Sequence, residues 1–465
     1  MSDTVKCKRW FFGALVCVTM ACGMTAMAWG KEEPADELVS LIVDSLHEND
    51  KELRAAGLDQ IRTGAKGEAA TRQFAAQLPK LSADAQAGLL GALADRGDVT
   101  ARPAVVELLK ATHEEPVKVA AIGALGAVGD ERDLPLLLSF LSSDSKTEKS
   151  AARAALVRLR GEGVSSTIAT TLKQSTDAPL RVALIEILTT RRALEARPDL
   201  LNLAVDSDAA VRAAAMNALG QLAGTAQIPG MLNGVFKAEK GSERDAAERA
   251  VVLVCSRTAD GTQRAAPLLA AMDKCGPSDR PALLMTLGRL GDPSARPTIE
   301  AAIADLAMHE AGVRALCNWP DASVAARLIE ILQADAQPKD RDLSLAALIR
   351  IAPLPDGRNN DQRLAMLKQV MGMCTRPEDQ NVLLKRASAI YTVEALRFVV
   401  PYLDQPAHAQ QACEAVVELA HHRDVRDANK ADFMPALDKV IQISKDATVI
   451  DRANRYKAGK TWVRP

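Results

Sequence analysis

The chain has 465 residues, with 58 Lys+Arg against 59 Asp+Glu and a formal net charge of -1, so no overall basic field exists to hold nucleic acid. Aromatic residues make up only 3% of the chain, too few for rows of base-stacking platforms or for an aromatic-rich β-sandwich. With 48% hydrophobic and 25% charged residues, the composition favours a folded, aliphatic, Ala/Leu-built helical protein over a disordered one.

The N-terminal segment has the pattern of a secretory signal peptide. Lys6, Lys8 and Arg9 form a positive n-region, an uncharged apolar stretch follows over 11–24, and Ala26-Met27-Ala28 is a small-x-small cleavage box. We therefore predict a signal peptide over 1–28, cleaved after Ala28, and an exported protein that is periplasmic or secreted.

Two alternatives to cleavage stay open. Residues 10–28 are nearly long enough to span a bilayer, although several Gly, Ala and Thr residues make them weakly hydrophobic. Cys22 is a candidate lipoprotein cysteine, although Thr19 stands where that motif usually has Leu. Membrane contact is expected only if the signal is uncleaved or lipidated. Residues 29–35 are predicted to be a short linker.

Cysteine spacing in the mature chain favours neither a disulfide framework nor a metal site. No two of its cysteines are closer than twenty positions and no C-x-x-C occurs, so we interpret them as small core residues. The pair Cys255 and Cys275 is the only bridge that we consider.

A repeat of about 32 residues organises the rest of the chain. It is visible as an anchor leucine at Leu93, Leu125, Leu156, Leu188, Leu219, Leu287 and Leu348. Proline stands ten residues after the anchor at Pro103, Pro135, Pro198, Pro229 and Pro297. A cation stands seven residues before it at Lys118, Lys149, Arg181, Arg212, Arg280 and Arg341. The register therefore rests on three independent residue types.

Each repeat is predicted to hold two helices. In the first, Val211, Ala215 and Leu219 share one helical face, and Asp208 is the predicted N-cap. Glycine is expected to end this first helix in a left-handed conformation at Gly97, Gly129 and Gly291. The second helix begins near the proline, which suits a first turn. Its apolar stripe is Val105/Leu109, Leu137/Leu141, Leu200/Ala204, Met231/Val235 and Ile299/Ile303.

Such a pair is too small to bury its own core, so the pairs must stack. Alanines at the facing positions allow close helix approach. We predict an all-α, right-handed superhelical solenoid of about twelve helix pairs over 36–456, with a hinge candidate at 350–360, where the repeat becomes irregular. A basic tail over 457–465 follows; it is interpreted as part of a cap in which Trp462 covers the last apolar face, with a binding role as the alternative.

The pattern Asp-x-x-Val-Arg-x-Ala-Ala-x-x-Ala-Leu-Gly-x-Leu at 208–222 resembles a HEAT repeat, specifically the short form of phycobilisome-lyase-like HEAT proteins. The resemblance is good over 89–303. With the signal pattern and the basic C-terminal end, the chain also resembles exported HEAT proteins of planctomycete-type bacteria. The resemblance implies an adaptor or scaffold that binds protein partners through helix faces, and it names no partner.

The recurring cations are predicted to join neighbouring repeats as a ladder with nearby acids. The adjacent pair His421 and His422 is not expected to bind metal, because neighbouring residues point about 100° apart on a helix, whereas helical zinc sites place histidines four apart. No G-x-S-x-G, P-loop or H-E-x-x-H motif occurs in the sequence. We therefore predict no catalytic, cofactor-binding or metal site.

The predicted function is a non-catalytic interaction scaffold of the bacterial cell envelope. Its protein partners are unidentified and nucleic acid is not among them. The second helices are expected to line the concave face, with partner-facing residues Glu107, Lys110, Ser139, Asn202, Asn233 and Glu300. The alternative is an enzyme or cofactor carrier related to bilin-lyase-like HEAT proteins.

Overall fold

The computed structural model describes residues 33–462, except 49, 259–262 and 335–336. The predicted signal peptide and residues 29–32 lie outside these described residues, as do 463–465. Residues 33–35, expected to be linker, begin the helix α2. The chain divides into two compact units, residues 1–164 and 165–465.

The first unit is built from helices joined by short turns. They are α2 (Glu33–Leu46), α3 (Lys51–Thr63), α4 (Glu68–Ala75), α5 (Ala83–Arg96), α6 (Arg102–Ala111), α7 (Glu115–Val128), α8 (Leu134–Ser139) and α9 (Lys146–Arg158). Single 3₁₀ turns precede or follow several of them, at Leu78–Lys80, Val99–Ala101, Glu131–Asp133 and Phe140–Ser142. The helices α3, α5, α7 and α9 are its first helices, and α4, α6 and α8 are its second helices.

The second unit continues the same alternation. Its second helices are α10 (Val164–Gln174), α12 (Arg197–Leu203), α14 (Ile228–Lys237), α16 (Ala266–Met272), α18 (Arg296–Ala304), α20 (Ala325–Gln333), α22 (Asn360–Met371), α24 (Val393–Val399) and α27 (Lys430–Ile443). Its first helices are α11 (Ala178–Thr190), α13 (Ala209–Leu222), α15 (Ser242–Ser256), α17 (Arg280–Leu290), α19 (His309–Cys317), α21 (Pro338–Ile351), α23 (Pro377–Ala387) and α25 (Ala409–His421). The short α26 (Arg423–Ala428) joins α25 to α27, and α28 (Ala447–Lys457) ends the row. Short 3₁₀ turns stand at Leu194–Ala196, Thr225–Gln227, Pro293–Ala295, Ala322–Val324 and Val400–Asp404.

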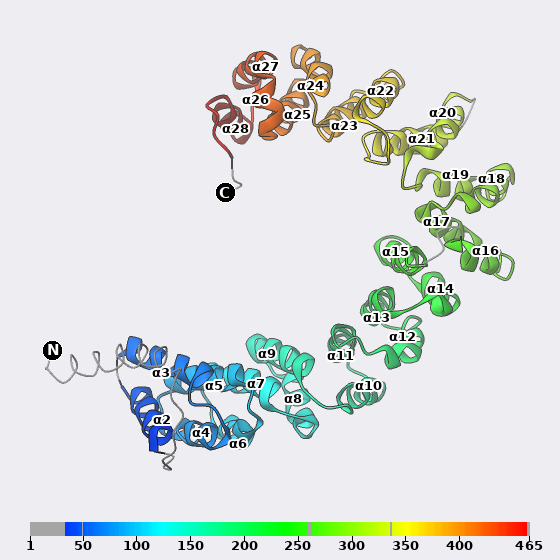
Figure 1. Ribbon diagram of the computed structural model, residues 1–465. Coiled ribbons are helices and arrows are strands. Elements are labelled where there is room, and N and C mark those ends of the chain that lie inside the picture. Colours follow the sequence, from blue (N-terminus) through cyan, green and yellow to red (C-terminus); the bar gives the residue numbers. More distant parts are fainter. Residues whose placement is uncertain (1–32, 49, 259–262, 335–336, 463–465) are drawn as a thin grey trace, which may run out of the picture. The chain divides into compact units, whose positions relative to one another are not determined.

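The predicted fold class is confirmed. Among the described residues there is no strand, and about twelve pairs of first and second helices follow one another from α3 with α4 to α25 with α27 (Figure 1). The chain is therefore an all-α solenoid of stacked helix pairs. Consecutive first helices pack on each other within each unit, as α5 does on α7 and α13 does on α15.

Helix ends largely follow the predicted residues. Asp208 caps α13, because its carboxylate accepts from the backbone N–H groups of Ala210 and Val211. Gly97 and Gly291 adopt the left-handed conformation, with φ of 68° and 67°. The same expectation for Gly129 is wrong, since its φ is -80°. A Cβ there would lie 2.3 Å from the carbonyl oxygen of Leu125, so this glycine provides space and not a left-handed turn.

The core lies between the two rows of helices. The five repeat prolines occupy the first turn of α6, α8, α12, α14 and α18, and every residue of the predicted second-helix stripes is buried. The largest fully buried side chains include Trp319, Phe74 and Phe433. Apolar burial between rows is thus what holds each pair to its neighbours.

First helices approach one another very closely. A Cβ on Gly126 of α7 would lie 2.5 Å from Cα of Ala155 in α9, and one on Gly288 of α17 would lie 2.1 Å from the carbonyl oxygen of Ala315 in α19. A stack bends toward the row whose members are closest, so the first helices form the concave side. Figure 1 shows this within the second unit, where α13, α15 and α21 lie inside the curve and α14, α18 and α20 outside it. Within the second unit, the expectation that the second helices line the concave face is therefore wrong.

The segment predicted as a hinge candidate, 350–360, joins α21 to α22. The guanidinium of Arg358 donates to the carbonyl oxygens of Ile351 at 3.0 Å and Ala352 at 3.2 Å, and pairs with Asp356 at 2.7 Å. The guanidinium of Arg363 donates to the carbonyl oxygen of Pro353 at 2.8 Å. The loop is therefore fastened to both flanking helices, and hinge motion there stays a prediction.

Candidate functional site

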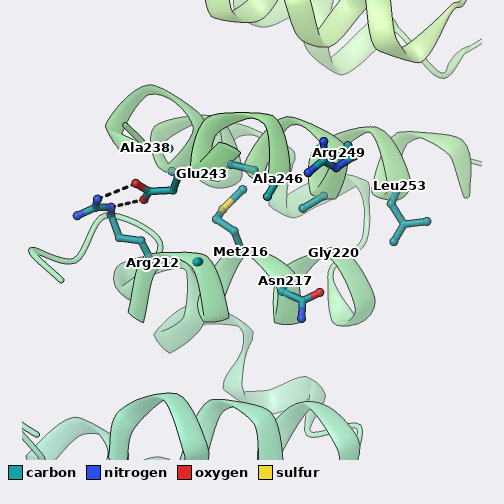
Figure 2. Close-up of a pocket in the computed structure, with 13 residues that line it drawn as sticks. Arg212, Met216, Asn217, Gly220, Ala238, Glu243, Ala246, Arg249 and Leu253 are labelled. Carbon is teal, nitrogen blue, oxygen red and sulfur yellow. Dashed lines mark hydrogen bonds and ion pairs between the residues drawn. The ribbon is translucent and has the colours of Figure 1, made fainter. Parts of the chain in front are cut away.

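A groove of about 270 Å³ opens between α13 and α15, with the end of α14 at its floor (Figure 2). Its opening lies on the exposed side of the first helices. Its lining is Arg212, Ala213, Met216, Asn217, Gly220, Gly234, Ala238, Glu243, Ala246, Ala247, Arg249, Ala250 and Leu253.

Missing side-chain volume creates this groove. Where α13 and α15 face each other, Gly220 meets Ala250 so closely that a Cβ on the glycine would lie 3.2 Å from the alanine Cβ. Nearer the solvent, Ala213 and Ala246 supply only methyl groups. At the floor, Gly234 of α14 leaves room for the thioether of Met216, since a Cβ there would lie 2.6 Å from its sulfur. The backbones are thus close while the exposed face between them stays open.

One end of the groove is closed by a buried ion pair. Arg212 is 5% exposed, and its Nε and Nη2 donate to the two carboxylate oxygens of Glu243 at 2.8 and 3.1 Å (Figure 2). Its Nη1 donates to the carbonyl oxygens of Asp206 and Ser207. The hydrogen bonds from Arg212 lower the pKa of Glu243 against the opposing effect of burial. Both charges are therefore engaged in joining the two helices.

The other end carries side chains that are free to bind. Arg249 and Asn217 are exposed and make no side-chain hydrogen bond or ion pair with any residue that the structure describes. Beside them, Leu253 keeps 49% of its surface exposed. This end therefore offers one unpaired guanidinium, one amide that both donates and accepts, and apolar surface.

The predicted partner-facing residues do not meet at this groove. They lie on second helices, at Glu107 and Lys110 in α6, Ser139 in α8, Asn202 in α12, Asn233 in α14 and Glu300 in α18. Five of them are exposed. Glu300 instead pairs with Arg327 of α20 at 3.0 Å. They are thus spread along the row of second helices, and those in the second unit, Asn202, Asn233 and Glu300, lie on its convex side.

Only some of the cations predicted to join neighbouring repeats form ion pairs. Lys118 lies 3.8 Å from Glu148 of the next first helix, in the manner that Arg212 joins Glu243. Arg181 pairs with Asp206 at 2.6 Å, and Arg341 donates to the carbonyl oxygen of Leu332 at 3.1 Å. The side chains of Lys149 and Arg280 form no ion pair among the described residues.

Another set of arginines, which was not predicted from the sequence, joins the repeats at the other end of the first helices. Arg96 donates to four carbonyl oxygens at the end of α3 and in the loop from α3 to α4, including that of Ile61 at 2.8 Å. Arg257 donates to the carbonyl oxygens of Gly220, Gln221 and Ala223. Arg350 donates to those of Cys317 and Trp319 at 2.9 and 2.6 Å. The sequence signal for these contacts is an arginine at, or within one residue of, the end of a first helix.

The C-terminal end is covered by its own residues. The guanidinium of Arg452 lies 4.9 Å from the ring centre of Trp462 and 5.8 Å from that of Tyr456, and pairs with Glu418 at 2.6 Å. Tyr456 is 1% exposed, and its hydroxyl lies 2.9 Å from Nδ1 of His421. These contacts favour the cap over a free binding tail for the described part of 457–465.

The remaining candidates form no reactive centre within the described residues. His422 stacks on Tyr391 with ring centres 3.6 Å apart, and no group of three or more His, Cys, Asp or Glu side chains in the described part is arranged to hold a metal ion. Cys255 and Cys275 are both free, so the considered bridge is absent, and burial raises the pKa of the Cys255 thiol to about 11. No helix within the described ranges is long and apolar enough to cross a membrane.

Comparison with known proteins identifies the repeats. The HEAT-repeat family profile matches residues 71–157 in the first unit and 166–252 in the second, so both segments carry HEAT repeats. No curated protein sequence matches the chain.

Three structures illustrate the likeness. A mutant of Kap121p has a TM-score of 0.48 at 13% identity, over 91% of this chain and 53% of that one. Kap121p bound to Nup53p has a TM-score of 0.47 at 13% identity, over 89% and 54%. A homology model of the full-length AP-3 complex has a TM-score of 0.40 at 13% identity, over 91% and 87%. The chain thus spans about half the length of Kap121p.

Proposed function

We propose that this protein is a non-catalytic scaffold of the bacterial cell envelope, which binds segments of protein partners on the exposed side of its first helices. The groove between α13 and α15 carries the proposal, because Arg249 and Asn217, which have no side-chain partner among the described residues, stand beside exposed apolar surface. HEAT solenoids are typical of interaction scaffolds, since stacked repeats expose long continuous surfaces.

The distribution of engaged and free side chains supports this choice of face. The buried polar residues of the first helices, such as Arg212 and Glu248, are engaged in ion pairs between repeats. Their exposed residues include Asn217, Arg249 and Leu253, which have no such structural use. Neither the site residues nor the comparisons support the alternative of an enzyme or cofactor carrier.

Photo-crosslinking tests the binding face. A benzophenone amino acid at Asn217 or Ala246 reports on first helices, and the same group at Asn202 or Asn233 is the matched control on second helices. Expressed in its native host, the protein should form discrete crosslinked adducts from the first pair of positions. Adducts from the second pair alone would contradict the proposed face.

Export is the second part of the proposal, supported by the charge and hydropathy pattern of residues 1–28 and by the resemblance to exported HEAT proteins of planctomycete-type bacteria. N-terminal sequencing of protein from soluble envelope and membrane fractions tests it. We expect the mature chain to begin at Trp29. Unprocessed protein in the cytosol would refute export, and lipid on Cys22 would replace cleavage after Ala28.

A further inference from the structure

We infer that the groove between α13 and α15 binds an acidic peptide segment, in which a carboxylate side chain adjoins an aliphatic one. This inference rests on the proposed function and names the chemistry of the partner segment. It is carried by the charge, the apolar surface and the size of the groove.

Most of the charge in the groove is already neutralised within the protein. Among the lining residues, Arg212 and Glu243 cancel as a bidentate pair, and the remaining ionisable side chain is Arg249. The lining residues therefore carry one net positive charge, at the exposed Arg249, while the exposed Glu239 lies outside the lining, 3.9 Å from Arg212 at the closed end. A guanidinium binds a carboxylate through two parallel hydrogen bonds, which makes an Asp or Glu side chain its best peptide partner.

Apolar surface beside Arg249 favours an aliphatic side chain of the peptide next to that carboxylate. Leu253 lies one helical turn beyond Arg249 on α15, and it keeps 49% of its surface exposed. Ala246 lies almost one turn before Arg249, and Met216 fills the floor (Figure 2). Aliphatic side chains on either side of the carboxylate would remove this surface from water.

The groove has room for side chains of a peptide. Its volume is about 270 Å³, just below the roughly 300–1,000 Å³ of small-molecule pockets. Asn217 faces the groove from α13, and its amide can donate to one backbone carbonyl and accept from one backbone N–H of an extended segment.

A second groove of the same row provides an internal contrast. It lies between α23, α25 and α28, and its lining includes three carboxylates, Glu414, Glu418 and Asp446, against the cations Lys385 and Arg452. Because Arg452 is already paired with Glu418, this groove is not positive. An acidic peptide should therefore prefer the α13–α15 groove.

The test uses two blocked peptides, acetyl-Gly-Leu-Glu-Leu-Gly-amide and the same peptide with Gln in place of Glu. Binding is followed by the methyl resonance of Met216 in the full protein labelled with ¹³C at its methionine methyl groups, with Met216→Leu for assignment. We expect the Glu peptide to shift this resonance with an affinity about tenfold above that of the Gln peptide, as loss of a charged hydrogen bond predicts.

Two pairs of variants locate the site. Arg249→Gln should bring the two peptides to within about twofold of each other, whereas Arg280→Gln, an exposed arginine of α17 outside the groove, should leave the preference intact. Ala246→Phe should fill the groove and abolish both shifts, whereas Ala210→Phe at an exposed position of α13 outside the lining should not.

Equal affinity for the two peptides in the unmodified protein, or no shift of Met216 with either, would overturn the inference. Crosslinks from Asn217 and Ala246 would still be obtained in that case if the first helices bind partners by other chemistry. Failure of the crosslinks as well would refute the proposed function, so the two failures are distinguishable.

Discussion

At the scale of single residues, glycines decide how closely the first helices pack. Gly126 and Gly123 both lie inside α7, but only Gly126 meets another backbone: a Cβ on it would lie 2.5 Å from Cα of Ala155, whereas one on Gly123 would have open space. The two positions therefore separate the packing effect of a methyl group from its effect on helix propensity.

We expect Gly126→Ala to destabilise α7 by about 1–3 kcal/mol, because overpacking forces the neighbouring helix to move. Gly123→Ala should instead stabilise it by roughly 0.5–1 kcal/mol, since alanine loses less backbone entropy on folding. Hydrogen exchange of peptides from 115–128 measures both. A loss of stability in Gly123→Ala would show that the space at that position is not open.

His309 is a second residue whose chemistry is specified by its neighbours. Its Nδ1 lies 2.6 Å from the carbonyl oxygen of Ile303 and its Nε2 lies 3.0 Å from Oδ2 of Asp340, which is 4% exposed. Both neighbours accept, so both nitrogens donate only in the charged imidazolium. The hydrogen bond to Ile303, followed by that to Asp340, raises the pKa of His309 above its ordinary 6.5.

Because the pKa is raised in the folded state, the stability from this contact is fully present below about pH 6.5 and is lost as the pH rises through the folded pKa. We expect His309→Gln to reduce the loss of stability between pH 6 and pH 8. The midpoint of urea unfolding, followed by the fluorescence of nearby Trp319 in protein of residues 29–465 with Trp29 and Trp462 replaced by Phe, measures this loss of stability at each pH. His422 has a lowered pKa and acts in the opposite direction, so the comparison is between variant and unmodified protein. Identical pH profiles would contradict this prediction.

At the scale of helices, arginines complete the ends of neighbouring first helices. The last carbonyls of a helix have no partner within it, and they carry the negative end of its dipole. Arg350 of α21 donates to the carbonyl oxygens of Cys317 and Trp319 at the end of α19. Arg350 is half-buried and the acceptor residue Trp319 is fully buried, and this burial lowers the pKa of the guanidinium.

Arg350→Leu should therefore lower the stability of the α19–α21 region by about 1–3 kcal/mol, the cost of leaving buried acceptors without a donor. The exposed Arg280→Leu in α17 is the control and should change stability by no more than about 0.5 kcal/mol. In protein of residues 29–465 whose Trp29 and Trp462 are replaced by Phe, the fluorescence of Trp319 in urea reports on this region directly, since its carbonyl is one of the acceptors. Equal effects of the two substitutions would exclude a capping role.

The arrangement of helices within a repeat was predictable from the sequence because it depends on local chemistry. Proline at the first turn, Asp208 as an N-cap and the buried stripes all act within a few residues of their position. Period and register follow from the same signals. The fold class therefore required no knowledge of long-range contacts.

The assignment of the concave row failed because it depends on contacts between repeats. Periodicity shows that both helices of a pair have an apolar face, and it does not show which row is more closely spaced. Glycine directly after the anchor, at Gly126, Gly220 and Gly288, was the signal that first helices touch. The groove needs the same information, since it forms where Gly220 and Ala250 bring two helices together without filling the space above them.

At the scale of the whole molecule, the stacking of repeats limits how far a perturbation travels. Each repeat packs mainly on its immediate neighbours, so stability is approximately a sum of repeat and nearest-neighbour contributions. Unfolding of such an array is not expected to be all-or-none. Gly126 in the first unit and Trp319 in the second are separated by about six repeats, so each reports on a different part of the chain.

We therefore expect Gly126→Ala to shift part of the far-UV circular dichroism transition in urea to lower concentration while leaving the transition of Trp319 unchanged. Fluorescence is read from protein of residues 29–465 in which Trp29 and Trp462 are both replaced by Phe. The fully buried Trp319 is then its only tryptophan. In the same background, Gly288→Ala should move the Trp319 transition, because its new methyl group would press on α19, which ends just before Trp319. If Gly126→Ala moved both transitions equally, the chain would unfold as one cooperative body, and the nearest-neighbour description of this solenoid would be wrong.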